Sequence, residues 1–429
     1  MRRPMNYPET LDHLDAVIRT GIKYNLVNIR RLLDILGHPE RAFPVVCVAG
    51  TNGKGSVCAF LESILAEAGY AAGLNTSPHL VTPRERIRIN REKVSPDEFS
   101  AAISEVREAA ETGWHPDDPA RPTFFETMTS AALCHFRNAG VDFALMEAGL
   151  GGRLDGTNGT QPLLSIITRI AVDHSKTLGN SLRKIAFEKA GISRPGKPLL
   201  IGAQRPRIGR HLTALARFRG SLPLRTDCRW KGKAESLALE TPRRTYRGIK
   251  LGLPGRYQLE NAATAARAAE IIESLGYHIG EDAVVNGLAR AYWPARLELT
   301  EISGRRVLID SSHNSDGIAR FLSELDSYPA DKRILIYAAM ADKAVNSIVA
   351  GLFPRFDKIF LPALPQKRAA APGDILTLAG KNAPRAELAG DTANAWQSAR
   401  RAARPGDLIV VTGSIYLAGE FKKFFTNES

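Results

Sequence analysis

The sequence predicts an α/β protein built on parallel sheets, and the alternation of two patterns carries this prediction. Short apolar runs alternate with stretches of helical periodicity over most of the 429 residues. The apolar runs occupy residues 45–49, 142–146, 163–168, 198–202, 307–310, 334–339, 359–364 and 408–413. Nearly continuous apolar strands between helices are typical of parallel sheets that are covered on both faces.

One helix can be followed residue by residue directly after the first apolar run. Its apolar positions repeat with helical spacing and end at Gly69, and they are Val57, Phe60, Leu61, Ile64, Leu65 and Ala68. This spacing predicts an amphipathic helix. Another helical stretch begins at Tyr257.

The chain is long enough for two domains, and the boundary is expected near the sequence WPAR at 293–296. A helical stretch ends before it and a fresh series of strands and helices follows it. We therefore expect an N-terminal domain over residues 1–296, and a smaller, Rossmann-like α/β domain over residues 297–429. Both lengths permit an independent core.

Composition indicates a folded, soluble protein. Hydrophobic residues make up 44% and charged residues 24% of the chain, as in ordinary globular proteins. No secretory signal and no apolar run of membrane-spanning length is recognisable, so no membrane association is expected. The four cysteines show no CxxC spacing, which disfavours a zinc site or a disulfide framework and predicts a reducing, cytoplasmic location.

Positive charge is concentrated in one segment of the chain. The formal net charge is +13, and residues 203–250 hold 13 Lys or Arg against three acidic residues. Phe218, Trp230 and Tyr246 are interleaved there, so nucleic-acid binding is an alternative. We favour a solvated face that also raises the electrostatic potential around an anionic ligand.

A glycine-rich loop lies between the first apolar run and the first helix. It comprises Gly50, Thr51, Asn52, Gly53, Lys54, Gly55 and Ser56. Strand, glycine loop and helix form the usual cradle for phosphates, in which backbone N–H groups face the anion and the lysine reaches the terminal phosphates. The loop departs from the Walker pattern, because Val48 stands at the first glycine position and Gly55 follows the lysine.

The loop VAGTNGKGSV resembles the ATP loop of the folylpolyglutamate synthase and dihydrofolate synthase family, a branch of the Mur ligases. Further matches follow in the family's order at residues 76–80, 123–127, 147–158, 173–174, 188–192, 254–256, 261–263, 293–298, 310–314 and 412–414. The resemblance implies a P-loop-containing, Mur-ligase-like N-terminal domain with a parallel sheet. It also implies a C-terminal ligase domain that binds glutamate and closes over the nucleotide.

The resemblance implies a magnesium site formed by Ser77, Glu147 and His174, with Mn²⁺ as a possible substitute. It also implies that Lys189 is carbamylated and helps to hold a second ion. Glu147 and His174 both follow apolar strands, and the carboxyl ends of parallel strands are where open α/β sheets bind ligands. The alternatives are a packed or capping His174, and a surface salt bridge between Lys189 and Glu188.

Nucleotide contacts are also implied by the resemblance. Asn261 matches the adenine contact, with a helix cap as the alternative. Arg296 matches the arginine that reaches the phosphates, with an ion pair to an acidic residue as the alternative. Asp310 and His313 would hold the ribose and base from the second domain. Ala295 replaces a common glycine at the junction, and this affects the expected hinge flexibility.

The folate contacts implied by the resemblance are Phe124, Glu126 and Asp155. Phe124 and Glu126 belong to TFFET, which resembles the pterin-facing segment of the family, and Asp155 would lie near the folate carboxylate. For Phe124 and its neighbour Phe125, packing in the core is an equal alternative.

Together these features predict a monomeric, ATP-dependent ligase that joins L-glutamate to folate or dihydropteroate through an acyl phosphate. Lys54, His174, Lys189 and Arg296 are the expected catalytic residues. Activity as both dihydrofolate synthase and folylpolyglutamate synthase is the favoured interpretation. The alternatives are a folylpolyglutamate synthase alone, a muramyl ligase, and a nucleotide-dependent nucleic-acid-binding module.

Overall fold

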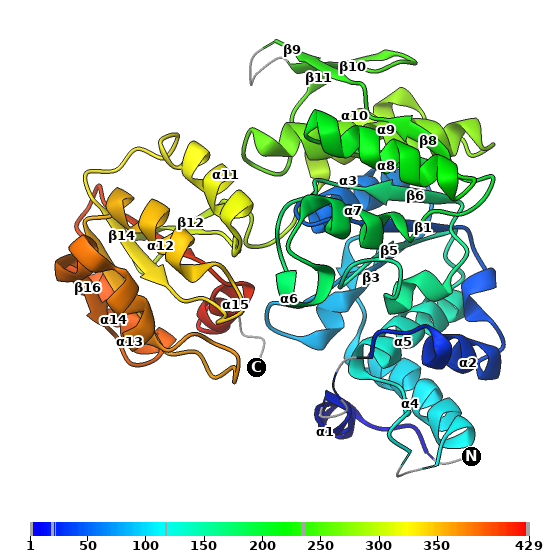
Figure 1. Cartoon of the computed structure of the whole chain (residues 1–429), viewed down its shortest axis with the longest axis horizontal. Coiled ribbons are helices and arrows are strands. Elements are labelled where there is room, and N and C mark those ends of the chain that lie inside the picture. The colour runs from blue at the N-terminus through cyan, green and yellow to red at the C-terminus, as the bar shows by residue number, and fades with distance from the viewer. Residues whose placement is uncertain (1–2, 19–20, 22, 116–117, 233–236, 426–429) are drawn as a thin grey trace.

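The computed structural model describes residues 3–18, 21, 23–115, 118–232 and 237–425. The described chain forms two lobes (Figure 1). The larger lobe holds the N-terminal elements up to α10 (Glu281–Arg290), and the smaller lobe holds the elements from β12 (Glu298–Ile302) onward. Among these residues, no helix combines the length and the apolar character needed to cross a membrane.

An eight-stranded sheet forms the centre of the larger lobe, in the order β4-β3-β2-β5-β1-β6-β7-β8. Its parallel strands are β2 (Ala72–Asn75), β5 (Phe143–Glu147), β1 (Val45–Ala49), β6 (Leu164–Ile167), β7 (Pro198–Ile201) and β8 (Leu222–Arg225). Antiparallel β3 (Ile87–Ile89) and β4 (Glu92–Lys93) extend one edge. The parallel strands direct their carboxyl ends to one edge, where ligands bind in such sheets.

Helices cover both faces of this sheet. One face packs against α3 (Lys54–Glu67), α9 (Tyr257–Ser274) and α10. The other face packs against α1 (Tyr7–Ile18), α2 (Val27–Ile35), α4 (Pro96–Gly113), α5 (Phe124–Ala139), α7 (Leu182–Ala190) and α8 (Pro206–Phe218). A separate three-stranded sheet comprises β9 (Arg229–Lys231), β10 (Leu237–Glu240) and β11 (Thr245–Ile249).

The smaller lobe is a six-stranded sheet in the order β12-β13-β17-β14-β15-β16. Antiparallel β12 is followed by the parallel strands β13 (Arg305–Ile309), β17 (Leu408–Thr412), β14 (Arg333–Tyr337), β15 (Lys358–Leu361) and β16 (Ala386–Leu388). One face packs against α11 (Ser315–Leu325), α12 (Val345–Leu352) and α13 (Pro372–Leu378). The other packs against α14 (Thr392–Ala402) and α15 (Ile415–Lys423).

The predicted fold class is confirmed, because each of the eight apolar runs contains a strand and the predicted helix is α3. The four cysteines are free thiols; the cytoplasmic location stays a prediction. The six-stranded sheet of the smaller lobe starts at Glu298. This change of sheet supports the proposed division of the chain between residues 296 and 297.

The junction between the lobes holds two buried residues in left-handed backbone conformations. Ala295 has φ 54° and Leu297 has φ 48°. The backbone N–H of Ala295 donates to Glu298 at 2.7 Å, and that of Leu297 donates to Asp310 at 3.1 Å. A glycine at 295 would adopt this conformation without strain. The side-chain acceptors therefore hold a backbone shape that the alanine itself disfavours.

The helix that follows the phosphate loop is fixed by a close approach of α10. A Cβ atom on Gly287 would lie 2.5 Å from the Cα of Ile64 and 2.6 Å from its backbone nitrogen. Neither backbone atom can move without shifting α3.

We therefore expect Gly287→Ala to destabilise the larger lobe by about 2 kcal/mol, because overpacking forces the two helices apart. Gly351 is a matched control, since it lies within α12 and a Cβ atom there would meet nothing within 4 Å. Gly351→Ala should instead stabilise its helix by about 0.5–1 kcal/mol. Urea denaturation measures both effects, and an equal response of the two variants would contradict the packing argument.

Candidate active site

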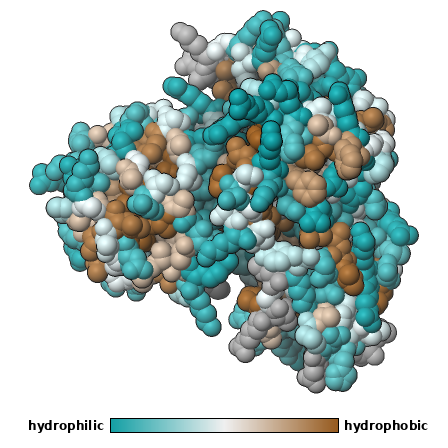
Figure 2. Space-filling view, viewed as in Figure 1, coloured by the Kyte–Doolittle hydropathy of each residue, from teal (hydrophilic) through white to brown (hydrophobic). Residues whose placement is uncertain are grey.

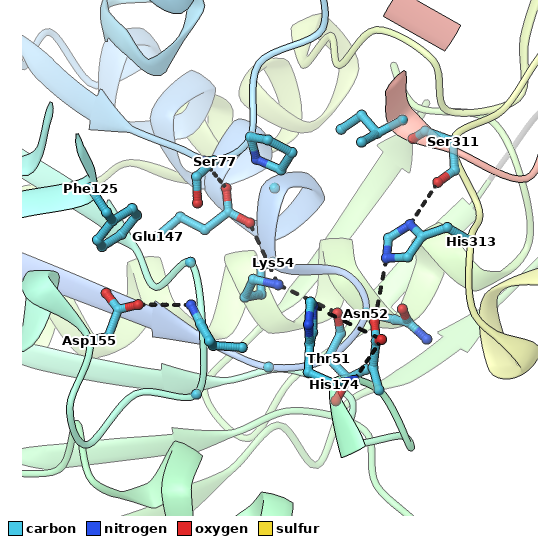
Figure 3. A pocket seen from close by; sticks show the side chains of 18 of the residues that line it. Thr51, Asn52, Lys54, Ser77, Phe125, Glu147, Asp155, His174, Ser311 and His313 are labelled. Carbon is cyan, nitrogen blue, oxygen red and sulfur yellow. Dashed lines mark hydrogen bonds and ion pairs between the residues drawn. The ribbon is translucent and has the colours of Figure 1, made fainter. Parts of the chain in front are cut away.

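A cavity of about 850 Å³ lies where the carboxyl ends of the central strands face the smaller lobe. It is lined by the glycine loop after β1, by Glu147 at the end of β5, and by the segment after β6. The smaller lobe contributes Ser311, Ser312 and His313 to the same wall. Figure 3 shows side chains from both lobes directed into this space.

At three glycines of the phosphate loop, a neighbouring side chain leaves too little room for a Cβ atom. A Cβ atom on Gly50 would lie 1.8 Å from the Oγ1 of Thr168, and one on Gly53 would lie 2.4 Å from the Oδ1 of Asn261. Gly55 faces the Trp293 ring, where a Cβ would lie at 3.0 Å. All seven loop residues predicted from the sequence, 50–56, line the cavity.

Lys54, Glu147 and Ser77 gather beside this loop (Figure 3). The Nζ of Lys54 lies 3.9 Å from Glu147 Oε1, and the backbone N–H of Ser77 donates to Glu147 Oε2 at 3.3 Å. Burial raises the pKa of Glu147, an effect that the Lys54 ammonium opposes. The buried hydroxyl of Ser77 has no hydrogen-bond partner among the described residues. A carboxylate next to an unsatisfied hydroxyl provides oxygen ligands of the kind that Mg²⁺ prefers.

His174 lines the cavity, but its charged neighbours differ from those of Glu147. Its ring nitrogens lie 4.0 Å from Asp173 and 4.0 Å from Asp342 of the smaller lobe. Burial lowers the pKa of His174 to about 4, so the ring is neutral at neutral pH. Within the part of the chain that the structure describes, no three His, Cys, Asp or Glu side chains are grouped as metal ligands. Ser77, Glu147 and His174 all line the cavity, and their role as a set of metal ligands stays a prediction.

Lys189 is buried and directed at the phosphate loop. Its Nζ donates to the backbone oxygen of Gly50 at 2.7 Å. Burial, with the nearby Lys54 ammonium, lowers the pKa of Lys189 to about 7. The alternative of a salt bridge with Glu188 is wrong, because Glu188 instead pairs with Arg153 at 3.0 Å. A partly neutral amine in a closed site has the chemistry that carbamylation requires.

Asn261 and Arg296 both line the cavity, and in both cases the structural alternative is wrong. Asn261 is not a helix cap, since α9 starts at Tyr257 with Arg256 as its N-cap. Its Nδ2 donates to Gln258 at 2.8 Å. Arg296 donates to the Ser311 hydroxyl at 2.7 Å, and no described carboxylate forms an ion pair with it.

Asp310 and His313 do not play the same part in the cavity wall. His313 lines the cavity, with its Nε2 3.4 Å from Asp173. Asp310 is fully buried, lies outside the lining, and accepts hydrogen bonds from the backbone N–H groups of Leu297 and Ser312. The predicted ribose contact of Asp310 is therefore not supported by its placement, because both of its oxygens brace the domain junction.

The three residues predicted for folate all line the cavity. Both carboxylates accept hydrogen bonds from the protein, but the buried Oε1 of Glu126 has no hydrogen-bond partner among the described residues. Glu126 accepts from the backbone and hydroxyl of Thr123, and so caps α5. Asp155 accepts from the N–H of Leu150 at 2.8 Å and caps the short 3-10 helix Gly156–Gly159. Phe124 is partly buried, and it both lines the cavity and packs against the hydrophobic core of this lobe.

Arg86 was not identified from the sequence. Only 8% of it is exposed, it lines the cavity, and its Nε donates to His79 Nδ1 at 2.9 Å. The guanidinium lies 5.0 Å from the centre of the Phe124 ring. Burial lowers the pKa of Arg86 to about 10, and none of the described carboxylates lies within ion-pair distance. The only sequence signal is an arginine within the strand-like pattern RERIRI.

A polar seam joins the two lobes over the phosphate loop, and no sequence pattern predicted it. Asp316 receives Arg169 at 2.9 Å and the Nδ2 of Asn52 at 2.9 Å. Burial alone would raise the pKa of Asp316, but hydrogen bonds from Arg169 and Asn52 lower it.

A second carboxylate completes this seam on the other lobe. Asp173 receives the Nζ of Lys343 at 2.5 Å and the Nδ2 of Asn314 at 3.2 Å. Both partners belong to the smaller lobe, while Asp173 immediately precedes His174. The seam therefore links the predicted nucleotide loop to both sides of the cavity.

Comparison with known proteins gives two domain matches. The chain matches the Mur ligase middle domain over residues 48–269, and the Mur ligase glutamate ligase domain over residues 295–415. It is 31% identical over 429 residues to the dihydrofolate synthase/folylpolyglutamate synthase of Bacillus subtilis, covering 97% of this chain and 98% of that protein. The Escherichia coli protein of the same name is 31% identical, with 95% and 92% covered.

Solved structures are similar over nearly the whole chain. Escherichia coli FolC in complex with DHPP and ADP has a TM-score of 0.87 at 29% identity, covering 98% of this chain and 97% of that one. Mycobacterium tuberculosis folylpolyglutamate synthase with ADP has a TM-score of 0.90 at 29% identity, covering 99% and 100%. The bifunctional enzyme of Yersinia pestis with AMPPNP and Mn ion has a TM-score of 0.85 at 28% identity, covering 99% of each chain.

The seam predicts a strong coupling between Arg169 and Asp316. Arg169→Ala and Asp316→Ala should each destabilise the closed arrangement, and the double variant should be little worse than either single one. We expect a coupling free energy of about 1–3 kcal/mol from a double-mutant cycle by urea denaturation. Additive effects of the two substitutions would show that the ion pair contributes nothing beyond its separate residues.

The environment of Lys189 predicts a pH-dependent stability. Between pH 7 and the ordinary pKa of lysine, the unfolded chain binds a proton that the folded chain has released. The free energy of unfolding should therefore rise with pH over this interval. Urea denaturation in CO₂-free buffer should show this rise in the parent protein and a flatter profile in Lys189→Met. Parallel profiles would mean that Lys189 does not titrate in this range.

Proposed function

Because the chain belongs to the folylpolyglutamate synthase and dihydrofolate synthase family of Mur ligases, we propose that its cavity joins L-glutamate to a folate-type carboxylate. The chain is an ATP-dependent ligase that works with a divalent metal ion. One observation carries the assignment of this chemistry to the cavity. A glycine phosphate loop, a lysine and a carboxylate–hydroxyl pair face one space that both lobes close.

The reaction needs ATP because a carboxylate is a poor acylating agent at neutral pH. Transfer of the γ-phosphoryl group of ATP to the carboxylate gives an acyl phosphate and ADP. The amine of glutamate then attacks the acyl carbon through a tetrahedral intermediate. The C–O bond to phosphate breaks, the nitrogen loses a proton, and the products are an amide and inorganic phosphate.

We propose that Lys54 and Arg296 stabilise the charge on the phosphoryl group during its transfer. Lys54 starts α3, where the helix N-terminus and the loop N–H groups also favour an anion. Arg296 enters from the domain junction, and its planar guanidinium suits phosphate oxygens. Asn261 and His313, which line the same wall, would contact the nucleoside.

Ser77 and Glu147 would hold the metal ion, because they place an unsatisfied hydroxyl next to a buried carboxylate. When bound, Mg²⁺ or Mn²⁺ neutralises phosphate charge and orients the oxygens of the transferring group. We propose that His174 supports this site through its neutral ring. A carbamylated Lys189 would add oxygen ligands, and its lowered pKa favours the neutral amine that reacts with CO₂.

Arg86 and Phe124 suggest how the organic acid is held. The buried guanidinium lines the cavity and has no carboxylate partner among the described residues, so we propose that it receives a substrate carboxylate. Phe124, stacked on Arg86, offers an aromatic face to the folate ring. Asp155 and Glu126 would act indirectly, by fixing the loop and the helix start that shape this pocket.

The relatives favour the folate branch over a muramyl ligase, since the relatives described above carry dihydrofolate synthase or folylpolyglutamate synthase names. We propose that the chain carries both activities, as the names of the Bacillus subtilis and Escherichia coli relatives state for those proteins. We propose that the chain works as a monomer, because the two lobes of one chain bring the phosphate loop, Glu147 and His313 to the same cavity. The seam would exclude water from the acyl phosphate.

An ADP-release assay tests this function. ADP should form with dihydropteroate and L-glutamate, and separately with tetrahydrofolate and L-glutamate, but not when the acceptor or glutamate is omitted. Lys54→Ala should reduce kcat by at least about 100-fold, because it removes a charge that acts in the transition state. Lys358→Ala, in the penultimate strand β15 of the smaller sheet and outside the cavity lining, is the matched control and should retain activity.

The outcomes of this assay separate the alternatives. Activity with tetrahydrofolate alone would remove the dihydrofolate synthase activity and leave the ligase. Release of ADP that requires neither acceptor nor glutamate would contradict the ligase itself.

A further inference from the structure

A group of unpaired basic side chains lies on α7 and α8, outside the cavity. Arg183 belongs to the first turn of α7, and Arg207, Arg210 and His211 belong to the start of α8. These four side chains, here called the basic patch, line one open hollow of about 400 Å³. None of them forms a hydrogen bond or an ion pair with another side chain that the structure describes. The hollow is therefore lined by basic side chains alone.

These positions are electrostatically unfavourable unless an anion is present. A helix N-terminus carries a partial positive charge, so acidic residues usually occupy its first turn. The first turns of α7 and α8 contain none, and α8 also lacks a side-chain cap. Between His174 and His211 there are nine Lys or Arg and a single acidic residue, Glu188. Glu188 is already paired with Arg153, so this segment offers no carboxylate to the basic patch.

The basic patch lies on the same edge of the sheet as the cavity. Strand β6 leads to Asp173 and His174, and the neighbouring parallel strand β7 leads to α8. Adjacent strands are about 4.8 Å apart. Gln204, just before α8, holds the backbone of Thr168 and Ile170 through its side chain at 2.7 and 3.0 Å. The start of α8 is thus tied to the segment that lines the cavity.

Helix α6 (Ser175–Leu178) connects the cavity wall to the basic patch. Leu178 lines the cavity and contacts Gly151 of the predicted folate loop. Gly179 packs against Lys184 of α7, and Lys176 and Lys184 add exposed positive charge along this path. Figure 1 shows α6 on the side of the larger lobe that faces the smaller one, with α7 next and α8 beyond α7, and Figure 2 shows hydrophilic side chains along the border between the lobes.

We infer that the basic patch binds the α-carboxylates of a poly-γ-glutamyl tail on the substrate. This inference rests on the proposed function, because only an enzyme that lengthens such a tail meets one. The terminal γ-carboxylate must reach the phosphate loop in every cycle, so each earlier glutamate is displaced outward by one residue. Each displaced residue exposes one more α-carboxylate, and arginine forks suit carboxylates. A path from the cavity over α6 leads these charges to the basic patch.

Nucleic acid is the rival ligand for this surface. A nucleic-acid site usually pairs many phosphates over an extended surface, whereas the basic patch is one hollow lined by four side chains, on helices that follow the cavity-lining segment along the chain. Its size and place favour a short polycarboxylate.

Binding of a penta-γ-L-glutamate peptide tests the inference without turnover. Calorimetry at low salt should show binding to the parent protein, and about tenfold weaker binding to the triple variant Arg183→Gln, Arg207→Gln, Arg210→Gln, since exposed ion pairs are individually weak. Arg217→Gln is the matched control, because Arg217 is an exposed arginine in the last turn of the same helix. Equal affinities for the parent and the triple variant would overturn the inference.

Steady-state kinetics provides the second readout. The KM of the triple variant for tetrahydropteroyl monoglutamate should stay within about twofold of the parent, while its KM for the pentaglutamate should rise about tenfold. Added salt should raise the pentaglutamate KM of the parent more than that of the variant. If the parent protein shows no activity on the monoglutamate, the proposed function is refuted. A failure of the proposed function is therefore distinguishable from a failure of the inference about the basic patch.

Two controls complete the test. Fluorescent oligo-dT should not compete with the peptide, and its loss of binding in the triple variant with unchanged pentaglutamate kinetics would assign the patch to nucleic acid. The thermal midpoint of the triple variant at low salt should equal or exceed that of the parent, because positive charge is removed from two helix N-termini. A lower midpoint together with unchanged peptide affinity would make these arginines structural.

Discussion

Two carboxylates of the seam, Asp173 and Asp316, hold the two lobes against each other around the cavity. Asp316 belongs to the smaller lobe and holds Asn52 of the phosphate loop, while Asp173 belongs to the larger lobe and holds Lys343 of the smaller one. Each carboxylate therefore crosses between the lobes, in opposite directions. Because these groups are mostly shielded from solvent, salt screens them less than surface pairs. The position of His174 and the shape of the phosphate loop depend on the same contacts.

The charges inside the cavity are unbalanced toward the positive. Lys54, Lys189, Arg86 and Arg296 line it, and Glu147 lies 3.9 Å from the Nζ of Lys54. Burial and repulsion from the Lys54 ammonium lower the pKa of Lys189, and this effect outweighs the opposing attraction of Asp173, Asp155 and Glu147. A triphosphate and a carboxylic acid would supply the missing negative charge. The excess positive charge of the cavity thus matches the negative charge of its substrates.

The sequence predicted what is local and missed what is long-range. Continuous apolar strands such as β1 and the glycine loop after it carry their own signal, and both are confirmed as structure. The edge strands β4 and β16 and the neighbouring strand β3 are short and partly polar, so no apolar run marks them. Arg169 and Asp316 are 147 residues apart, and no local pattern pairs them. The sequence pattern around Asp310 is ambiguous. A carboxylate at the end of a strand has the same pattern whether it binds a ligand or accepts from a backbone N–H.

The structure shows which cations of the basic segment 203–250 are paired, whereas the sequence gives only their number. Between residues 203 and 250, several cations are neutralised locally, as Lys231 is by Glu240 and Arg243 by Glu273. The remaining unpaired cations include those at the start of α8, beside the cavity. A uniform basic face would attract any polyanion, but a face neutralised away from the cavity concentrates its potential at one edge. This distribution favours short anionic substrates that enter the cavity over a long polymer lying across the surface.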